Sequence, residues 1–187
     1  MNVLIGFERS QEVLAAFMAL GHKGMSCDKY ADGEKGLPHY RGDIFDVLGC
    51  GWDLVILHPP CTHLAVSGNR WYAGTQERRD AIAFVESLWF FSDYRGRLGL
   101  ENPVGVLSSQ SRLGKATQYI QPWQFGHPET KKTGLWLRDL PPLVPTNIVE
   151  GREQRIWKMP PSPERQELRS RTYSGIARAM AEQWGSL

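Results

Sequence analysis

The stretch that most constrains the fold is a short apolar run that ends at two prolines. Trp52-Asp53-Leu54-Val55-Ile56-Leu57 carries four consecutive aliphatic residues between turn-forming segments, a pattern typical of a buried strand. His58-Pro59-Pro60-Cys61 follows directly, and because each proline fixes its own φ angle and lacks an amide hydrogen, the strand cannot simply continue. The chain must therefore turn at the carboxyl end of this strand, the edge at which open α/β sheets bind ligands.

Cys61 is the residue that this turn presents. A thiol on a stiff loop at the mouth of a site is a candidate nucleophile. The plainer alternative is a small buried hydrophobe after a proline turn, since free cysteines are common in protein cores. The prolines and the cysteine alone do not decide between the two.

The length and charge of the chain set outer limits. With 187 residues we expect one domain, spanning residues 1–187. The net charge is only +2, so a surface that binds nucleic acid must be local. Cys27, Cys50 and Cys61 lie far apart and form no CxxC pair, which predicts neither a disulfide framework nor a metal site. There is no apolar run of the roughly 18 residues that a membrane span needs and no signal-peptide pattern, so we expect a soluble, intracellular protein.

The chain opens with the pattern of a strand, a turn and a helix. Residues 2–5 predict a short strand, and Ser10 is placed to cap a helix that runs to Leu20 and stops at Gly21. The expected apolar face of that helix comprises Val13, Leu14, Phe17 and Leu20. This opening is typical of nucleotide-binding α/β folds.

The first turn lacks the GxGxxG fingerprint of a dinucleotide site. Gly6 is followed by Glu8 and Arg9, and a carboxylate at this place would repel a pyrophosphate. An ordinary strand-to-helix turn is the alternative that a single glycine leaves open.

Two acidic residues follow in predicted turns. Residues 23–27 predict a second strand with Asp28 at its end, about 20 residues beyond the first turn, where a carboxylate commonly receives a ribose hydroxyl. An exposed loop aspartate is the commoner case. Residues 29–41 predict a loop, and Gly42-Asp43-Ile44 places a second carboxylate in a turn.

After the Cys61 loop, Thr75 is placed to cap a packing helix. Its helical pattern is carried by Ala81, Ile82, Val85, Leu88 and Trp89. Residues 97–100 predict a strand that delivers Glu101-Asn102-Pro103, so Glu101 could face the same pocket as Cys61. Prolines are frequent further on, and residues 103–165 are expected to be rich in loops.

Five pieces stand in one order along the chain: the Gly6 turn, Asp28, Gly42-Asp43-Ile44, Pro59-Pro60-Cys61 and Glu101-Asn102. This order closely resembles the cytosine carbon-5 DNA methyltransferases, and is most similar to their small phage or prophage members. Residues 62–68 match in spacing the segment that follows the Pro-Pro-Cys loop of that family.

Three further segments carry the resemblance. Arg70 suits an arginine that the family has shortly after this loop, and residues 126–137 look like the family's Pro-Gln-x-Arg-x-Arg block running into a strand. Residues 173–177 resemble the closing motif, whose helix returns to the first strand. In this chain Ile176, Met180 and Trp184 fall on one face of that helix.

The chain also departs from the family pattern. The substituted positions are Glu8, Arg9, Thr62, Ala65, Glu129, Lys131 and Thr133. Only about 50 residues follow the strand expected at residues 135–137, so no separate target-recognition domain fits.

The resemblance implies an α/β fold: a single Rossmann-like S-adenosylmethionine-dependent methyltransferase domain with a mixed, mostly parallel twisted sheet. It also implies S-adenosyl-L-methionine as cofactor, with Asp28 on the ribose hydroxyls and Asp43 on the adenine amine. The full set of candidate cofactor residues is Gly6, Phe7, Glu8, Arg9, Ser10, Asp28, Asp43, Ile44, Pro59 and Ser174.

The resemblance also implies a covalent mechanism. The Cys61 thiolate would add to carbon 6 of cytosine and so make carbon 5 nucleophilic enough to take the methyl group. Glu101 would protonate or hydrogen-bond nitrogen 3, with Asn102 orienting the loop of the glutamate. Arg70 and Lys131 would stabilise the adduct or contact phosphate.

The expected partner is DNA, and the expected place of action is the cytoplasm of a bacterial cell, with no membrane and no metal involved. Two alternatives stay open: a non-catalytic relative that serves as a partner subunit or decoy, and an enzyme that acts on RNA or a free nucleotide. The presence of both Cys61 and Glu101 favours an enzyme. The oligomeric state is open, with a homodimer as one option.

Residues 70–72 and 123–132 are basic and aromatic. They are expected to contact nucleic acid with short or relaxed sequence specificity.

Overall fold

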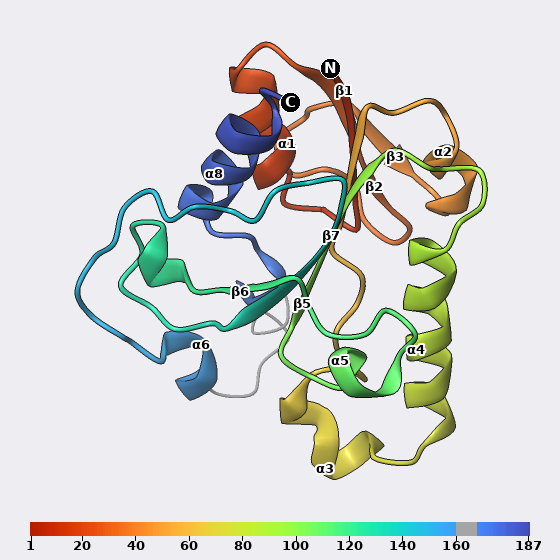
Figure 1. Ribbon diagram of the computed structural model, residues 1–187, viewed down its shortest axis with the longest axis vertical. Coiled ribbons are helices and arrows are strands. Elements are labelled where there is room, and N and C mark those ends of the chain that lie inside the picture. Colours follow the sequence, from red (N-terminus) through yellow and green to blue (C-terminus); the bar gives the residue numbers. More distant parts are fainter. Residues whose placement is uncertain (160–167) are drawn as a thin grey trace.

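The computed structural model describes residues 1–159 and 168–187, without the side chains of residues 156 and 157. The described residues form a seven-stranded sheet in the order β3-β2-β1-β4-β5-β7-β6 (Figure 1). The strands are β1 (Asn2–Gly6), β2 (Lys23–Asp28), β3 (His39–Arg41), β4 (Leu54–Leu57), β5 (Arg97–Pro103), β6 (Gln118–Ile120) and β7 (Thr133–Arg138). Strand β7 runs antiparallel to both of its neighbours, and the other pairings are parallel. The expected α/β class with a mixed, mostly parallel sheet is confirmed.

The strand order places a change of direction beside the first strand. From β1 the chain moves outward to β2 and β3, and then crosses to the other side of β1 to form β4 and β5. The crossovers therefore diverge between β1 and β4. At such a point the loops leave a crevice at the carboxyl ends of the strands, which is the usual ligand site of open α/β sheets.

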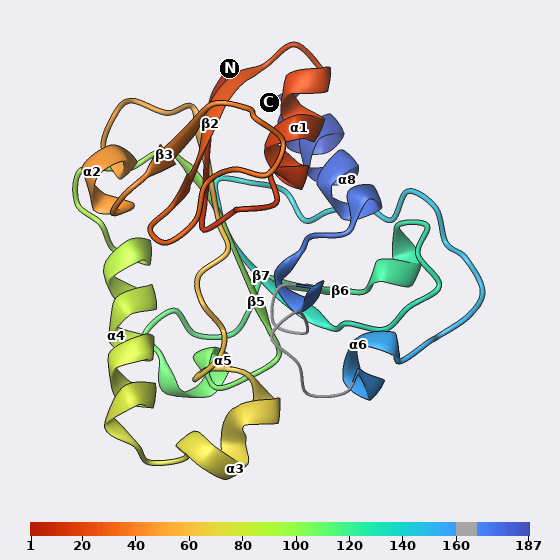
Figure 2. The ribbon, with the colours of Figure 1, turned by 180° about the vertical axis from the view of Figure 1, so that it is seen from behind.

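Helices cover both faces of the sheet, as Figures 1 and 2 show. On one face lie α1 (Glu12–Ala19) and α8 (Ser174–Trp184), and on the other α2 (Phe45–Leu48), α4 (Gln76–Trp89) and α5 (Leu107–Gln110). Shorter elements are η1 (Val66–Gly68), α3 (Asn69–Tyr72), η2 (Pro122–Gln124) and α6 (Arg155–Lys158). The alternation of side chains along each strand supplies both layers, since Val3 and Ile5 face α1 and α8 while Leu4 faces the opposite helices.

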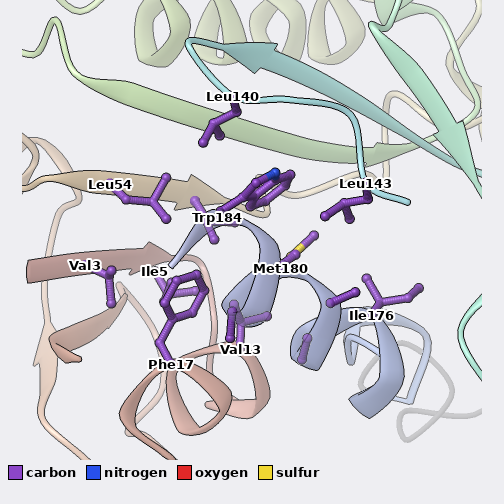
Figure 3. Close-up of a cluster of buried hydrophobic side chains, with 14 of the residues drawn as sticks. Val3, Ile5, Val13, Phe17, Leu54, Leu140, Leu143, Ile176, Met180 and Trp184 are labelled. Carbon is purple, nitrogen blue, oxygen red and sulfur yellow. The ribbon is translucent and has the colours of Figure 1, made fainter. Parts of the chain in front are cut away.

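The core beneath α8 confirms the apolar face expected for this helix. Ile176, Met180 and Trp184 are buried and lie with side chains of β1, β4 and α1 in Figure 3. A Cβ atom at Gly99 of β5 would lie 3.4 Å from the Trp184 ring, so the glycine leaves room for this indole on the sheet. Packing of α8 fixes the end of the chain beside the first strand.

Several local predictions are confirmed and others are wrong. The Thr75 hydroxyl accepts a hydrogen bond from the Arg78 amide and caps α4, and Gly21 ends α1 with φ of 81°. Leu20 is half exposed rather than part of the buried face of α1. Ser10 caps no helix, because the residue before α1 is Gln11 and the Glu8 carboxylate takes the free amides instead.

Two strands lie where loops were expected. Strand β3 lies inside residues 29–41, and β6 inside residues 103–165; both are only three residues long. The rest of the second stretch is mostly irregular as far as residue 159, and residues 160–165 lie outside the described residues. In the part of the chain that the structure describes, no helix is long and apolar enough to cross a membrane.

Candidate functional site

A cavity of about 970 Å³ lies at the carboxyl edge of the sheet. Its walls come from the turns that follow β1, β2, β3 and β4, from the end of β5, and from residues 169–172 before α8. Its size is near the upper end of the range of small-molecule pockets.

This one cavity brings together most of the residues that the sequence singled out. The predicted site residues that line it are Phe7, Glu8, Arg9, Ser10, Asp28, Asp43, Ile44, Pro59, Cys61, Glu101 and Lys131. Gly6, Arg70, Asn102 and Ser174 do not line it. Residues from six separate segments, from Phe7 to Lys131, thus meet at the edge where the strand order predicts a ligand.

His58 and Glu101 form the central polar contact of the cavity. The Nδ1 atom of His58 lies 3.2 Å from Oε2 of Glu101, and their side chains are 7% and 18% exposed. Strands β4 and β5 pair in register up to Leu57 opposite Leu100, so His58 and Glu101 are the next pair along. The backbone pairing of β4 and β5 ends at Leu57, before the prolines. Beyond this point, contacts between side chains join the two segments.

Asn102 holds the cysteine loop. Its buried Nδ2 donates to the carbonyl of Pro59 at 3.0 Å, again across the extended register of β4 and β5. The expectation that Asn102 orients the loop of Glu101 therefore needs correction: Glu101 lies within β5, and the amide instead fastens Pro59, two residues before Cys61.

The Cys61 thiol is partly buried beside both positive and negative groups. Burial raises its pKa above the ordinary value, the Glu101 carboxylate raises it further, and Lys131 and Arg169 act in the opposite direction. The resting side chain is therefore a thiol at neutral pH. At neutral pH, the thiolate of Cys61 is favoured by loss of the Glu101 charge or by a new positive charge in the cavity.

Glu101 has the opposite tendency. Burial opposes its ionisation, but the hydrogen bond from His58 and the charges of Lys131 and His58 outweigh that cost and hold the Glu101 pKa below its ordinary value. The structure thus pairs an ionised carboxylate on β5 with a neutral thiol on the loop that follows the neighbouring strand β4.

Glu8 occupies the beginning of α1. Its carboxylate accepts hydrogen bonds from the amides of Val13 at 2.6 Å and Leu14 at 3.2 Å. Burial raises the Glu8 pKa, although His58 and the two amides act to lower it. The preceding Phe7 has φ of 62°, a strained value for a residue with a side chain, and this turns Glu8 back toward the helix. Two of the amides that could bind a phosphate are therefore already bonded to Glu8.

Two partly exposed carboxylates, Asp28 and Asp43, also line the cavity. Oδ1 of Asp28 accepts hydrogen bonds from the amides of Tyr30 and Ala31, and no donor among the described residues reaches Oδ2. Asp43 bonds to the Phe45 amide and forms an ion pair with Lys29 at 3.1 Å. The Phe45 amide and Lys29 hold the Asp43 pKa below its ordinary value. Asp28 is the carboxylate better prepared to receive hydroxyl groups.

Lys131 joins the cavity to the segment before α8. Its ammonium donates to the carbonyl oxygen of Arg169 at 2.8 Å and lies 3.5 Å from that of Arg171. The Arg169 guanidinium in turn lies 3.4 Å from the hydroxyl of Ser67, on the loop that follows Cys61. Lys131, the cation expected near the adduct, therefore also holds residues 169–171 in the wall of the cavity.

The four predicted residues outside the lining have other surroundings. The Arg70 guanidinium lies 5.3 Å from the centre of the Trp71 ring, and Trp71 itself lines the cavity and is 70% exposed. Gly6 lets the end of β1 approach Leu57, because a Cβ there would lie only 2.6 Å from that side chain. Ser174 is exposed, and its hydroxyl lies 3.4 Å from His127.

Comparison of the sequence with protein-family models and with curated proteins finds no match. Within residues 1–159 and 168–187, no group of three or more His, Cys, Asp or Glu residues could hold a metal ion.

Sequence reasoning missed three parts of the site. His58 carried a signal, since it is the first residue after β4 and precedes the prolines, but its contact depends on the register with β5. Trp71 was expected only to contact nucleic acid, and it lines the cavity itself. Residues 169–172 carried no local signal, because their place depends on Lys131 and on the packing of α8.

Proposed function

We propose that this protein is an S-adenosylmethionine-dependent methyltransferase that methylates carbon 5 of cytosine, with DNA as the substrate. The observation that carries the proposal is the single cavity that places Cys61 and Glu101 beside one another and opposite Asp28 and Asp43. The strand order β3-β2-β1-β4-β5, shared with nucleotide-binding doubly wound folds, supports a Rossmann-like methyltransferase domain.

The residues of the cavity fit a nucleoside cofactor without phosphate. Because Glu8 already binds the Val13 and Leu14 amides at the start of α1, a pyrophosphate would meet both a carboxylate and a helix end at which two of the first amides are taken. S-adenosylmethionine instead brings a sulfonium cation and ribose hydroxyls. Oδ2 of Asp28 is available to accept those hydroxyls. When bound, the cofactor supplies the methyl group and a positive charge.

The chain's own residues then have defined tasks. Cys61 attacks carbon 6 as a thiolate, and a positive charge in the cavity favours this form by offsetting the effect of Glu101 on the thiol pKa. Glu101 contacts nitrogen 3 and the exocyclic amine of the pyrimidine. Asn102 keeps the cysteine loop in place through the Pro59 carbonyl.

A base stacked in a duplex cannot reach Cys61, so it must leave the stack, at a cost of a few kcal/mol. Trp71 is placed to offset part of this cost: it is 70% exposed, lines the cavity and carries Arg70 beside its ring. Stacking on an aromatic ring contributes about 1–3 kcal/mol per base and reads little sequence. We therefore expect short or relaxed specificity and strong dependence on salt.

Mass spectrometry of nucleosides and calorimetry of cofactor binding together test this function. For the first measurement, the protein is incubated with DNA or RNA and a methyl-labelled cofactor, and the nucleosides are then analysed. Labelled 5-methylcytosine from DNA is the expected product. Methyl label on another nucleoside, or only in RNA, would contradict the proposed substrate, and absence of label together with absence of cofactor binding by calorimetry would contradict the function.

A further inference from the structure

The polar side chain that the proposed chemistry leaves without a task is His58. It is nearly buried, lies 3.2 Å from Glu101 and follows directly on a fully buried strand. Its other ring nitrogen, Nε2, is buried without a hydrogen-bond partner among the described residues. A buried imidazole with one unsatisfied nitrogen costs stability, and such groups persist where they have a function.

Its position is set by three neighbouring strands. The amide of His58 donates to the carbonyl of Gly6 at the end of β1, and its ring faces Glu101 of β5. Of the charged groups around the imidazole, Glu8 comes from the turn after β1 and Glu101 from β5. Lys131 in turn acts on Glu101, and Glu101 acts on the Cys61 thiol. His58 therefore lies between two carboxylates, one at each side of β4.

We propose that His58 is the positioning residue of Glu101, and that the His58–Glu101 pair carries the proton that nitrogen 3 of the pyrimidine takes up during the attack. This inference rests on the proposed function and deepens it. The hydrogen bond to Oε2 fixes the carboxyl group of Glu101, which lines the cavity.

The Cys61 thiol first loses its proton to solvent, and its sulfur forms a bond to carbon 6. The C5–C6 π pair becomes a C4–C5 π pair, and the C4–N3 π pair moves to nitrogen 3, which takes a proton from the His58–Glu101 pair. The C4–C5 π pair would then form the bond from carbon 5 to the methyl group, and the methyl–sulfur bond of the donor would break with its electron pair left on that sulfur. The C4–N3 π bond re-forms, and nitrogen 3 returns the proton to the pair. The C5 hydrogen then leaves to solvent as a proton while the sulfur–carbon bond breaks.

This arrangement predicts how the rate depends on pH. At the acid side the rate of adduct formation falls because Cys61 stays a thiol, and at the alkaline side it falls because the pair has lost its proton. In His58→Gln the amide can still hold Glu101, but only a carboxyl group remains to carry the proton, and the ordinary pKa of a carboxyl group lies below that of an imidazole. Loss of the His58 charge lets the Glu101 pKa rise and so reduces this difference. The alkaline decline should move to lower pH, and the rate near pH 7.5 should fall about tenfold to a hundredfold.

The experiment measures trapping by DNA that contains 5-fluorocytosine, across a range of pH, for the unmodified protein, His58→Gln and the control His22→Gln. His22 lies just before β2, at the amino ends of the strands and close to Met1, whereas the cavity lies at their carboxyl ends. Its replacement should leave the pH profile unchanged. Equal loss of rate at every pH in His58→Gln, with no change in the shape of the profile, would show a purely structural role and overturn the proposal.

A second readout does not depend on activity. The chain has only five histidines, so the His58 ring signals can be assigned by NMR through the His58→Gln spectrum. Glu101→Gln should shift these ring signals, because it replaces the carboxylate oxygen that lies 3.2 Å from Nδ1 of His58. Unchanged His58 ring signals would overturn the pairing itself. If the pairing is found but the unmodified protein forms no adduct, the proposed function fails and the proton role fails with it, whereas the ion pair stands.

Discussion

The two ends of the cavity are built in different ways. At one end Asp28, at the end of β2, and Asp43, in the turn after β3, are partly exposed and accept hydrogen bonds from amides two or three residues further along the chain. At the other end Glu101 of β5 and Cys61, on the loop after β4, lie among groups that come from positions 58, 131 and 169. The first end is local and open to water, whereas the second is assembled from distant segments and largely buried.

This difference has electrostatic consequences. Near Cys61 and Glu101, burial makes the energy of each ionised group depend on its neighbours, so a thiol and a carboxylate on adjacent strands shift in opposite directions. At the exposed end, Lys29 and Asp43 are about half exposed, and water screens their interaction. We therefore expect replacements at the buried end to change chemistry, and those at the open end to change affinity.

Replacement of Cys61 should have the largest effect. Cys61→Ala removes the nucleophile and should abolish covalent trapping by DNA with 5-fluorocytosine, while calorimetry should show nearly unchanged cofactor affinity. Cys50→Ala is the matched control, since Cys50 is exposed and lies outside the cavity. If Cys61→Ala is trapped at the same rate as the unmodified protein, the proposed covalent mechanism is wrong.

Replacement of Glu101 should come next. Glu101→Gln keeps the shape of the side chain but removes its proton transfer, and methyl transfer should slow by about 100-fold or more, the usual contribution of an acid–base group. Cofactor affinity should stay within a few-fold if the two ends of the cavity act separately. If calorimetry shows that cofactor affinity falls by the same factor as the rate of methyl transfer, the two ends of the cavity do not act separately.

Replacement of Asp28 tests the open end. Asp28→Asn should weaken cofactor binding by about 1–3 kcal/mol, the usual loss for hydrogen bonds to a charged group, and leave the rate at saturating cofactor nearly unchanged. Asp80→Asn, on the exposed side of α4, is the matched control. A lower saturated rate in Asp28→Asn would mean that the open end also takes part in the chemistry.

The same division explains what the sequence could predict. The turns after β1, β2 and β4, and the carboxylates in them, follow from local patterns of apolar runs, glycines and prolines, and all of these turns line the cavity. The contact between His58 and Glu101 spans 43 positions, and that between Ser67 and Arg169 spans 102. Such contacts depend on strand register and helix packing, which no local pattern specifies.

Two local predictions failed for reasons that are also physical. Ser10 has the right chemistry for a helix cap, but the left-handed conformations of Phe7 and Gln11 bring Glu8 to the helix start instead. Strand β6 has only three residues and no alternation, so its pairing with β7 alone defines it. In both cases the deciding interaction lies outside the segment from which the prediction was made.

The smallest expected effect tests the electrostatics of the buried end without any catalysis. Burial and the Glu101 charge raise the Cys61 pKa, so iodoacetamide should alkylate Cys61 more slowly than the exposed Cys50 at pH 7, and its rate should rise as the pH is raised.

Glu101→Gln removes the negative charge beside the thiol, and this must lower the Cys61 pKa. Since a change of one in pKa alters the thiolate fraction about tenfold, alkylation of Cys61 at pH 8 should become about threefold to tenfold faster. Peptide mass spectrometry reports Cys61 and Cys50 in the same sample, so the rate at Cys50 corrects for differences in reagent. A Cys61 rate that falls or stays constant in this variant would show that Glu101 does not control the thiol, and that the two sides of the buried end act independently.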